Sequence, residues 1–306
     1  MIIKPSTQTN LYELNHELIN LINLYKKRNL PNKILLSGQK GIGKSTMAYH
    51  LINYILSENE EFSYDIRNYK INENNKSYKL IQNRTNPNFI LIDVIDEKKK
   101  IDIKQIRNLI INLNKSSFNK KPRIILIDNI ELLNNNSINA LLKTLEEPGK
   151  NVFFILINNN KKILETLKSR CLNFNIFLSN KQSNEILKKL INSEKYNLIH
   201  EDLLNYYFTP GKIFNLIKFS EENDIDLFNM DLHELLSFII DKSLYKNDIY
   251  IKNYIFELIE VFISKNISNK SFEFFNYFIN KINNTKKFNL SEETLFLEFR
   301  EKVLNG

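Results

Sequence analysis

The chain has 306 residues, a formal net charge of +8, and a composition of 42% hydrophobic and 25% charged residues. This length suggests two or three domains, and the composition is that of a soluble globular protein. No apolar run reaches the ~18 residues that a membrane-spanning helix needs, and no charged lead precedes a long apolar stretch at the N-terminus, so we expect a cytoplasmic protein without membrane contact. A single cysteine, Cys171, excludes an internal disulfide framework and a zinc site of several thiolates.

Residues 1–180 alternate short apolar runs with helical patterns, which predicts a parallel sheet flanked by helices. The expected strands are Ile34–Leu36, Phe89–Val94, Ile124–Ile127, Val152–Ile157 and Leu172–Phe177. The expected helices are Leu11–Lys27, Lys44–Ile55, Ile103–Leu113, Ser137–Leu145 and Ile163–Lys168. Between about Glu58 and Asn88 the chain is polar and rich in Asn, and we expect an irregular insertion on the surface.

After Asn180 the strand signals stop and the pattern is helical to the end. The expected helices are Gln182–Asn192, Asp202–Phe208, Lys212–Phe219, Leu232–Asp241, Ile249–Ser264, Ser268–Ile282 and Glu292–Leu304, with Asn289 as the N-cap of the last. We therefore expect three parts: an α/β domain at 1–180, a small helical domain at 181–222 and a terminal helical domain at 223–306.

The most specific motif runs from Gly38 to Ser45 and fits G-x-x-x-x-G-K-[ST] in full, between a short apolar strand and a helix. In such a loop glycines let backbone N–H groups point at phosphate oxygens, and the helix N-terminus adds partial positive charge. The candidate ATP-binding residues here are Gly38, Gly41, Gly43, Lys44, Ser45 and Thr46. Lys44 is expected to reach the β and γ phosphates, and the Ser45 hydroxyl to ligate Mg²⁺. The alternatives are a glycine-rich turn without a ligand and a site that has lost its nucleotide.

A second motif ends the strand before Asp128, where an acid suits a further contact to Mg²⁺ at the carboxyl ends of the strands. A hydrolytic site of this class carries Glu directly after that Asp, and this chain has Asn129 there. An amide cannot accept a proton as a base, so we expect ATP binding with weak or absent hydrolysis. Glu131 is the nearest carboxylate that could act as a substitute.

The stretch Asn139–Pro148, NALLKTLEEP, predicts an amphipathic helix that Pro148 stops. Its sequence resembles the signature of bacterial DNA polymerase III clamp-loader AAA+ subunits, as do Ser169-Arg170-Cys171 and the region from Leu14 to Gly38. Within that family the chain is most similar to the delta-prime subunit in versions that keep an intact phosphate loop. Asn129 in place of Glu, the absence of a four-cysteine module in the 58–88 insertion, and an end at Gly306 without a Pro-rich linker favour it over the gamma/tau motor subunit.

The resemblance implies an AAA+ module with a helical lid and a helical collar, in a DNA polymerase III holoenzyme. It implies that Arg170 is an arginine finger that acts in trans on a neighbour's γ-phosphate. It also implies that Asn158 is the polar sensor of the γ-phosphate, although Asn159 and Asn160 leave the register open, and that Lys212 stands where the family's second sensor usually has Arg. The implied partners are gamma/tau and delta subunits in a hetero-pentamer, the sliding clamp, and primer–template DNA through the complex.

Two other functions stay open. An active AAA+ ATPase, either a motor subunit of the gamma/tau type or a helicase-loader-like protein, predicts brisk turnover and self-assembly. A nucleotide-free scaffold subunit predicts no response to Mg-ATP. An independent DNA-binding role is the weakest option, since the sequence has no helix-turn-helix, zinc finger or aromatic–basic platform.

Overall fold

Five short apolar segments form one parallel sheet in the computed structural model of the chain. They are β1 (Lys33–Ser37), β2 (Phe89–Ile92), β3 (Arg123–Ile127), β4 (Val152–Asn158) and β5 (Leu172–Asn175). Their order across the sheet is β2-β3-β4-β1-β5. The three central strands are almost continuously buried, which is typical of a parallel sheet covered on both faces. All five expected strands and the α/β fold class are confirmed.

The structure describes residues 4–94, 100–114, 119–149, 151–191, 196–197, 199–204, 208–227, 229–246, 249–265, 272–288 and 290–305. The chain divides into two compact units, Met1–Ile186 and Leu187–Gly306, and the sheet belongs to the first. No helix in these described ranges is long and apolar enough to cross a membrane.

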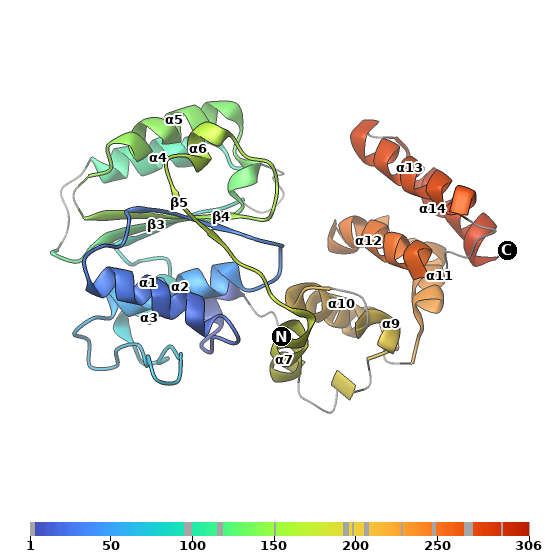
Figure 1. The fold of residues 1–306 in the computed structure, drawn as a ribbon, viewed down its shortest axis with the longest axis horizontal. Helices are drawn as coiled ribbons and strands as arrows, with labels where there is room; N and C mark the ends of the chain where they lie inside the picture. The colour runs from blue at the N-terminus through green and yellow to red at the C-terminus, as the bar shows by residue number, and fades with distance from the viewer. Residues whose placement is uncertain are drawn as a thin grey trace. The chain divides into compact units, whose positions relative to one another are not determined.

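Helices cover both faces of the sheet in the first unit (Figure 1). Helices α4 (Ile103–Leu113), α5 (Asn135–Glu146) and α6 (Glu165–Lys168) lie on one face, and α1 (Asn15–Lys26), α2 (Lys44–Leu56) and α3 (Lys76–Gln82) lie on the other. Polar side chains fix where several of these helices begin. The Asp102 side chain accepts from the Lys104 backbone N–H at the start of α4, and Asn134 does the same for Ser137 at α5.

The register of the sheet brings four loops together at one edge. Ser37 at the end of β1 lies opposite Asn158 at the end of β4. Ile127, which ends β3, lies opposite Leu156 of β4 and Ile92 of β2. The loops that follow β1, β4, β3 and β2 therefore start side by side at the carboxyl edge, where parallel α/β sheets bind their ligands.

The insertion at 58–88 is more ordered than we expect from its sequence. It contains α3, and its Tyr64, Ile71 and Ile81 are buried. The expectation of an irregular surface segment is therefore wrong in part, because buried hydrogen bonds around Glu60 and Asn75 compensate for the weak hydrophobic pattern.

The second unit is helical and is built around one hydrophobic cluster from Leu187 to Leu304. Its helices are α7 (Asn180–Ile191, whose first residues belong to the first unit), α9 (Glu201–Leu204), α10 (Pro210–Glu222), α11 (Leu232–Asp241), α12 (Ile249–Lys265), α13 (Phe272–Phe288) and α14 (Glu292–Phe299). The expected N-cap Asn289 lies outside the described residues, and it is Ser291 that caps α14 by accepting from the Thr294 N–H. The boundary that we expect at 222/223 stays a prediction.

Candidate functional site

The loop between β1 and α2 needs glycine at two points that the structure makes explicit. Gly43, which caps α2, has φ +96°, a conformation that side chains with a Cβ rarely adopt. At Gly38 an added Cβ would lie 2.4 Å from the carbonyl oxygen of Ile176, so the backbone could not pass as close to the segment that follows β5. The loop therefore keeps the tight path that aims backbone N–H groups at an anion.

Lys44, the first residue of α2, is only 3% exposed. Its Nζ donates to the carbonyl oxygens of Gly38 at 2.9 Å and Gln39 at 2.6 Å, and to Oδ1 of Asn159 at 3.0 Å. Burial lowers the pKa of Lys44 to about 8, against the opposing pull of the Asp128 and Glu131 carboxylates. The ammonium is thus buried beside the phosphate loop and is held there by acceptors.

Ser45 and Asp128, the two residues expected to hold Mg²⁺, are hydrogen-bonded to each other, and their binding of the ion stays a prediction. The Ser45 hydroxyl donates to Oδ2 of Asp128 at 2.7 Å, which links the start of α2 to the end of β3. Burial raises the pKa of the Asp128 carboxyl, with a smaller effect of the same sign from Asp93. A hydroxyl and a carboxylate are ligands that suit Mg²⁺. Among the described residues no group of three or more His, Cys, Asp or Glu could hold a metal ion. Thr46 follows in the first turn of α2 and is half-buried.

Asn129 has both ends of its amide engaged. Its Nδ2 donates to Oδ1 of Asp93 at 2.8 Å, and its Oδ1 accepts from Nδ2 of Asn159 at 2.7 Å. The residue has φ +55°, in the left-handed region that Asn tolerates better than most residues. The side chain at this position is therefore anchored between residues that follow β2 and β4, the two strands that flank β3.

The asparagine that contacts Lys44 is Asn159, one residue beyond the expected sensor. The side chain of Asn158 instead closes its own loop, donating to the Lys161 carbonyl at 3.0 Å and accepting from the Lys161 N–H at 3.2 Å. Asn159 also donates through Nδ2 to Oε1 of Glu131 at 2.9 Å. Which of these asparagines would contact a γ-phosphate stays a prediction.

These contacts form one chain that follows the order of the strands. Lys44 follows β1, Asn159 follows β4, Asn129 follows β3, and Asp93 follows β2. Sequence reasoning missed Asp93, although an acid directly after an apolar strand, as Asp128 is after β3, was a signal that could have found it.

Arg170 lies at the surface of the first unit, two residues after α6 ends. Its guanidinium donates to the Glu146 carboxylate at 2.5 Å and to the Thr166 carbonyl at 2.6 Å, and its side chain is 32% exposed. An exposed guanidinium is compatible with the expected role in trans, which stays a prediction. Lys212 belongs to the second unit, at the start of α10, where its Nζ pairs with Glu257. Its expected contact with nucleotide also stays a prediction.

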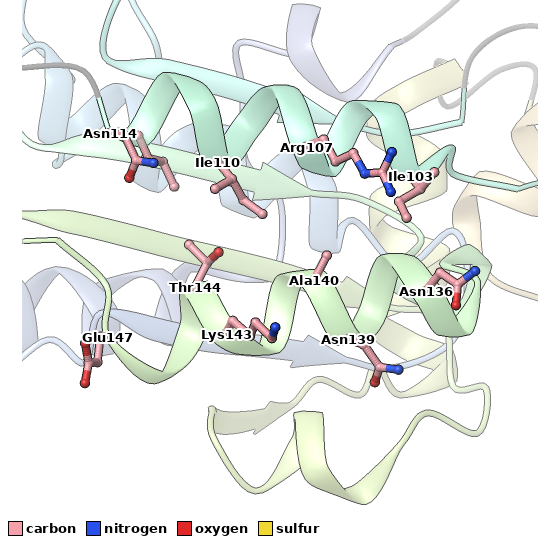
Figure 2. Close-up of a pocket in the computed structure, with 11 residues that line it drawn as sticks. Ile103, Arg107, Ile110, Asn114, Asn136, Asn139, Ala140, Lys143, Thr144 and Glu147 are labelled. Atoms are coloured by element: carbon pink, nitrogen blue, oxygen red, sulfur yellow. The ribbon is translucent and has the colours of Figure 1, made fainter.

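A groove of about 660 Å³ lies apart from these residues, between α4 and α5 (Figure 2). It is lined by Ile103, Arg107, Ile110, Leu113, Asn114, Asn136, Asn139, Ala140, Lys143, Thr144 and Glu147. None of the candidate site residues lines it, and its mixture of apolar and oppositely charged groups indicates no particular ligand.

Comparison with known proteins identifies the family of the chain. A family model described as DNA polymerase III, delta subunit, matches residues 14–190. The chain is 32% identical over 171 residues to the DNA polymerase III subunit gamma of Buchnera aphidicola subsp. Schizaphis graminum, covering 55% of this chain and 45% of that protein. It is 28% identical over 179 residues to the DNA polymerase III subunit delta' of Buchnera aphidicola subsp. Baizongia pistaciae, covering 56% and 52%. The chain thus spans about half the length of these relatives.

Among solved structures, a DNA polymerase III, gamma subunit-related protein from Thermotoga maritima is similar with a TM-score of 0.51 at 17% identity. The match covers 92% of this chain and 99% of that one. At this identity the likeness shows a shared fold.

Proposed function

The chain belongs to the DNA polymerase III delta subunit family, and on that premise we propose that it is an ATP-binding clamp-loader subunit of the delta-prime type. The observation that carries the proposal is the complete phosphate loop, with Lys44 buried behind it and the Ser45–Asp128 pair beside it. Mg²⁺ held by Ser45 and Asp128 would neutralise phosphate charge when nucleotide is bound.

We propose further that the site binds ATP and hydrolyses it slowly or not at all. Asn129 cannot take a proton from water, and both ends of its amide are already hydrogen-bonded. The alternative base, Glu131, has both carboxylate oxygens engaged by Asn159. We infer that neither residue is poised as a general base, since Asn129 carries an amide and the Glu131 carboxylate is held toward Asn159.

In the complex, the chain would act mainly as a structural subunit and not as an ATP-hydrolysing motor. It would join gamma/tau and delta subunits in a hetero-pentamer that opens the sliding clamp and places it on primer–template DNA. The exposed Arg170 would be offered to the nucleotide site of a neighbouring subunit, where a planar guanidinium fits phosphate oxygens. The names of the delta' and gamma relatives support membership of such a complex, and the role of Arg170 rests on its position and chemistry alone.

Nucleotide binding by the purified chain tests the proposal. Mg-ATP at about 100 times its Kd should stabilise the folded chain by ~2.7 kcal/mol, seen as a rise in melting temperature. Lys44→Ala should abolish the rise, and Lys76→Ala, which changes an exposed lysine at the start of α3, should preserve it. The absence of any response in the unaltered chain would favour a nucleotide-free scaffold.

Two further measurements separate the remaining alternatives. Brisk Mg²⁺-dependent turnover that Lys44→Ala removes would assign the chain to the active motor type instead. Affinity purification from the native cell should recover a longer subunit with its own phosphate loop, together with the sliding clamp. Recovery of neither would contradict the clamp-loader assignment.

A further inference from the structure

The carboxylate of Glu131 holds Asn159 at two points. Its Oε1 accepts from the side-chain Nδ2 of Asn159 at 2.9 Å, and its Oε2 accepts from the backbone N–H of Asn159 at 3.3 Å. Glu131 is half-buried in the 3₁₀ turn Ile130–Leu132 that follows β3, and Asn159 follows the neighbouring strand β4. The two loops are therefore clamped together beside Lys44.

The partners of Asn159 leave its amide only one orientation. Lys44 can only donate, so the oxygen Oδ1 must face it, and ionised Glu131 can only accept, so the nitrogen Nδ2 must face Glu131. The second hydrogen of Nδ2 goes to Oδ1 of Asn129. Every polar atom of this side chain is thus occupied, and its direction is set by its neighbours.

This orientation matters for a phosphate at the loop. The lysine of such a loop reaches the β and γ phosphates, so the end of Asn159 nearest to a terminal phosphate is its oxygen, which cannot donate to it. The amide nitrogen, which could donate, is the end that Glu131 holds. We propose, building on the nucleotide-binding function above, that Glu131 is a positioning residue that keeps the Asn159 amide from the terminal phosphate and so limits the preference of the site for ATP over ADP.

Glu131 can affect the site in a second way, through its charge. The carboxylate favours the charged form of Lys44 and would repel a terminal phosphate. A simple loss of charge and a release of Asn159 both raise the affinity for ATP, whereas a purely structural role predicts a fall. The experiment must therefore separate the hold of Glu131 on the Asn159 amide from the effect of the Glu131 charge. It must also separate both from a role of Glu131 in stabilising the fold alone.

Affinities of the full chain for ATP and ADP, each with Mg²⁺ at fixed ionic strength, provide this test. Glu131→Gln removes the charge and leaves one acceptor oxygen where the carboxylate has two, so the two-point hold on Asn159 is broken and its amide can turn. We expect the ratio of ATP to ADP affinity to rise about tenfold, the effect of one hydrogen bond to a charged group. Glu131→Asp keeps the charge but is one methylene shorter, so it loosens the clamp and should raise the ratio as well.

The double variant Glu131→Gln, Asn159→Ala decides between the causes. Without an amide to release, its ratio should equal that of Asn159→Ala alone. Persistence of the rise in the double variant would overturn the proposal in favour of charge, and an unchanged or lower ratio in Glu131→Gln would overturn it directly. Glu61→Gln, an exposed glutamate beyond the far end of α2, is the matched control. Failure of the unaltered chain to bind either nucleotide would instead contradict the proposed function, so the two failures are distinguishable.

Discussion

Arg170 and Glu146 form an ion pair on the surface of the first unit, with the guanidinium 2.5 Å from the carboxylate. The pair joins the loop after α6 to the last residue of α5. Both side chains are partly exposed, so the pair adds little to stability, on the order of 0–1 kcal/mol. The guanidinium also donates to the Thr166 carbonyl at 2.6 Å, so the proposed transfer to a phosphate on another subunit would exchange both contacts.

Removing this guanidinium should affect the assembly and spare the isolated chain. Arg170→Ala is expected to cut the ATPase rate of the assembled complex by ~10-fold or more, because an arginine finger stabilises the charge that develops on the transferred phosphate. Nucleotide binding and melting temperature of the isolated chain should stay as they are. Lys168→Ala, a neighbouring exposed cation, serves as the control, and an unchanged rate in assembled Arg170→Ala would remove the finger assignment.

Restoring a glutamate after Asp128 should not create an ATPase. In Asn129→Glu the new carboxylate replaces the amide that now donates to Asp93 at 2.8 Å, and it must adopt the left-handed backbone of Asn129 at a cost of roughly 1 kcal/mol. We expect a lower melting temperature and no brisk turnover in a steady-state assay of the isolated chain.

The repulsion between the new carboxylate of Asn129→Glu and the Asp93 carboxylate can be tested separately from the backbone strain. Adding Asp93→Asn to Asn129→Glu supplies an amide that can donate to the new carboxylate, so part of the lost melting temperature should return. Brisk turnover in the single variant would show that the proposed obstacle to hydrolysis is mistaken.

Glu60 is expected to be the main polar support of the 58–88 insertion. Its carboxylate accepts from the Ser77 hydroxyl at 2.6 Å, from Asn75 at 3.0 Å and from Lys121 at 2.8 Å. Burial acts to raise the pKa of Glu60, but the hydrogen bonds from Lys121 and Ser77 outweigh it and the pKa lies below its ordinary value. Glu60→Gln should therefore cost about 1–3 kcal/mol in denaturant unfolding at pH 7, and Glu61→Gln almost nothing.

The pH dependence of that difference follows from the sign of the shift. Because the pKa of the Glu60 carboxyl is lower in the folded chain than in the unfolded chain, its ionised form stabilises the folded chain at pH values above about 4.5. This stabilisation is lost as the pH falls from there through the pKa of the folded chain. The gap between the unaltered chain and Glu60→Gln should shrink below about pH 4.5. A gap that stays constant down to pH 3 would show that charge is not involved.

His50 should make the chain sensitive to mild acid. The ring is fully buried between the Tyr64 hydroxyl, 2.9 Å from Nδ1, and the Gln8 carbonyl, 3.1 Å from Nε2, and burial lowers its pKa to about 4. Because the unfolded chain takes up this proton near pH 6.5 and the folded chain only near pH 4, stability falls across that window, by about 3 kcal/mol in all.

Unfolding free energies measured from pH 7 to pH 4 test this dependence. The slope should be smaller in His50→Gln than in the unaltered chain, while His16→Gln, which changes an exposed ring, should keep the full slope. Equal slopes in all three proteins would contradict the assignment to His50.

The sheet could be predicted because each strand is a short apolar run bounded by polar residues, and the loop from Gly38 to Ser45 because its pattern is local. Asn159 could not be chosen over Asn158 from sequence, since three asparagines follow one another and only the path of the backbone after β4 decides which side chain turns to Lys44. Asp93 went unnoticed because its partner, Asn129, is 36 residues away.

The helix α3 escaped prediction for a different reason. Its seven residues form too short a segment for helix propensity to decide. The Asn75 side chain caps the helix by accepting from the Tyr78 N–H, and the Ser77 hydroxyl donates to Glu60. Glu60 is 17 residues before Ser77, so a local sequence pattern does not reveal this contact.

The three acceptors around Lys44 also bear on how quickly a nucleotide can enter. The two loop carbonyls and Asn159 hold the ammonium in the free chain, and an arriving triphosphate must draw it from them. We therefore expect nucleotide association at the proposed site to include a local rearrangement of Lys44 after encounter. Release would return the ammonium to the same three acceptors, which offsets part of the attraction between Lys44 and the phosphates in the net affinity.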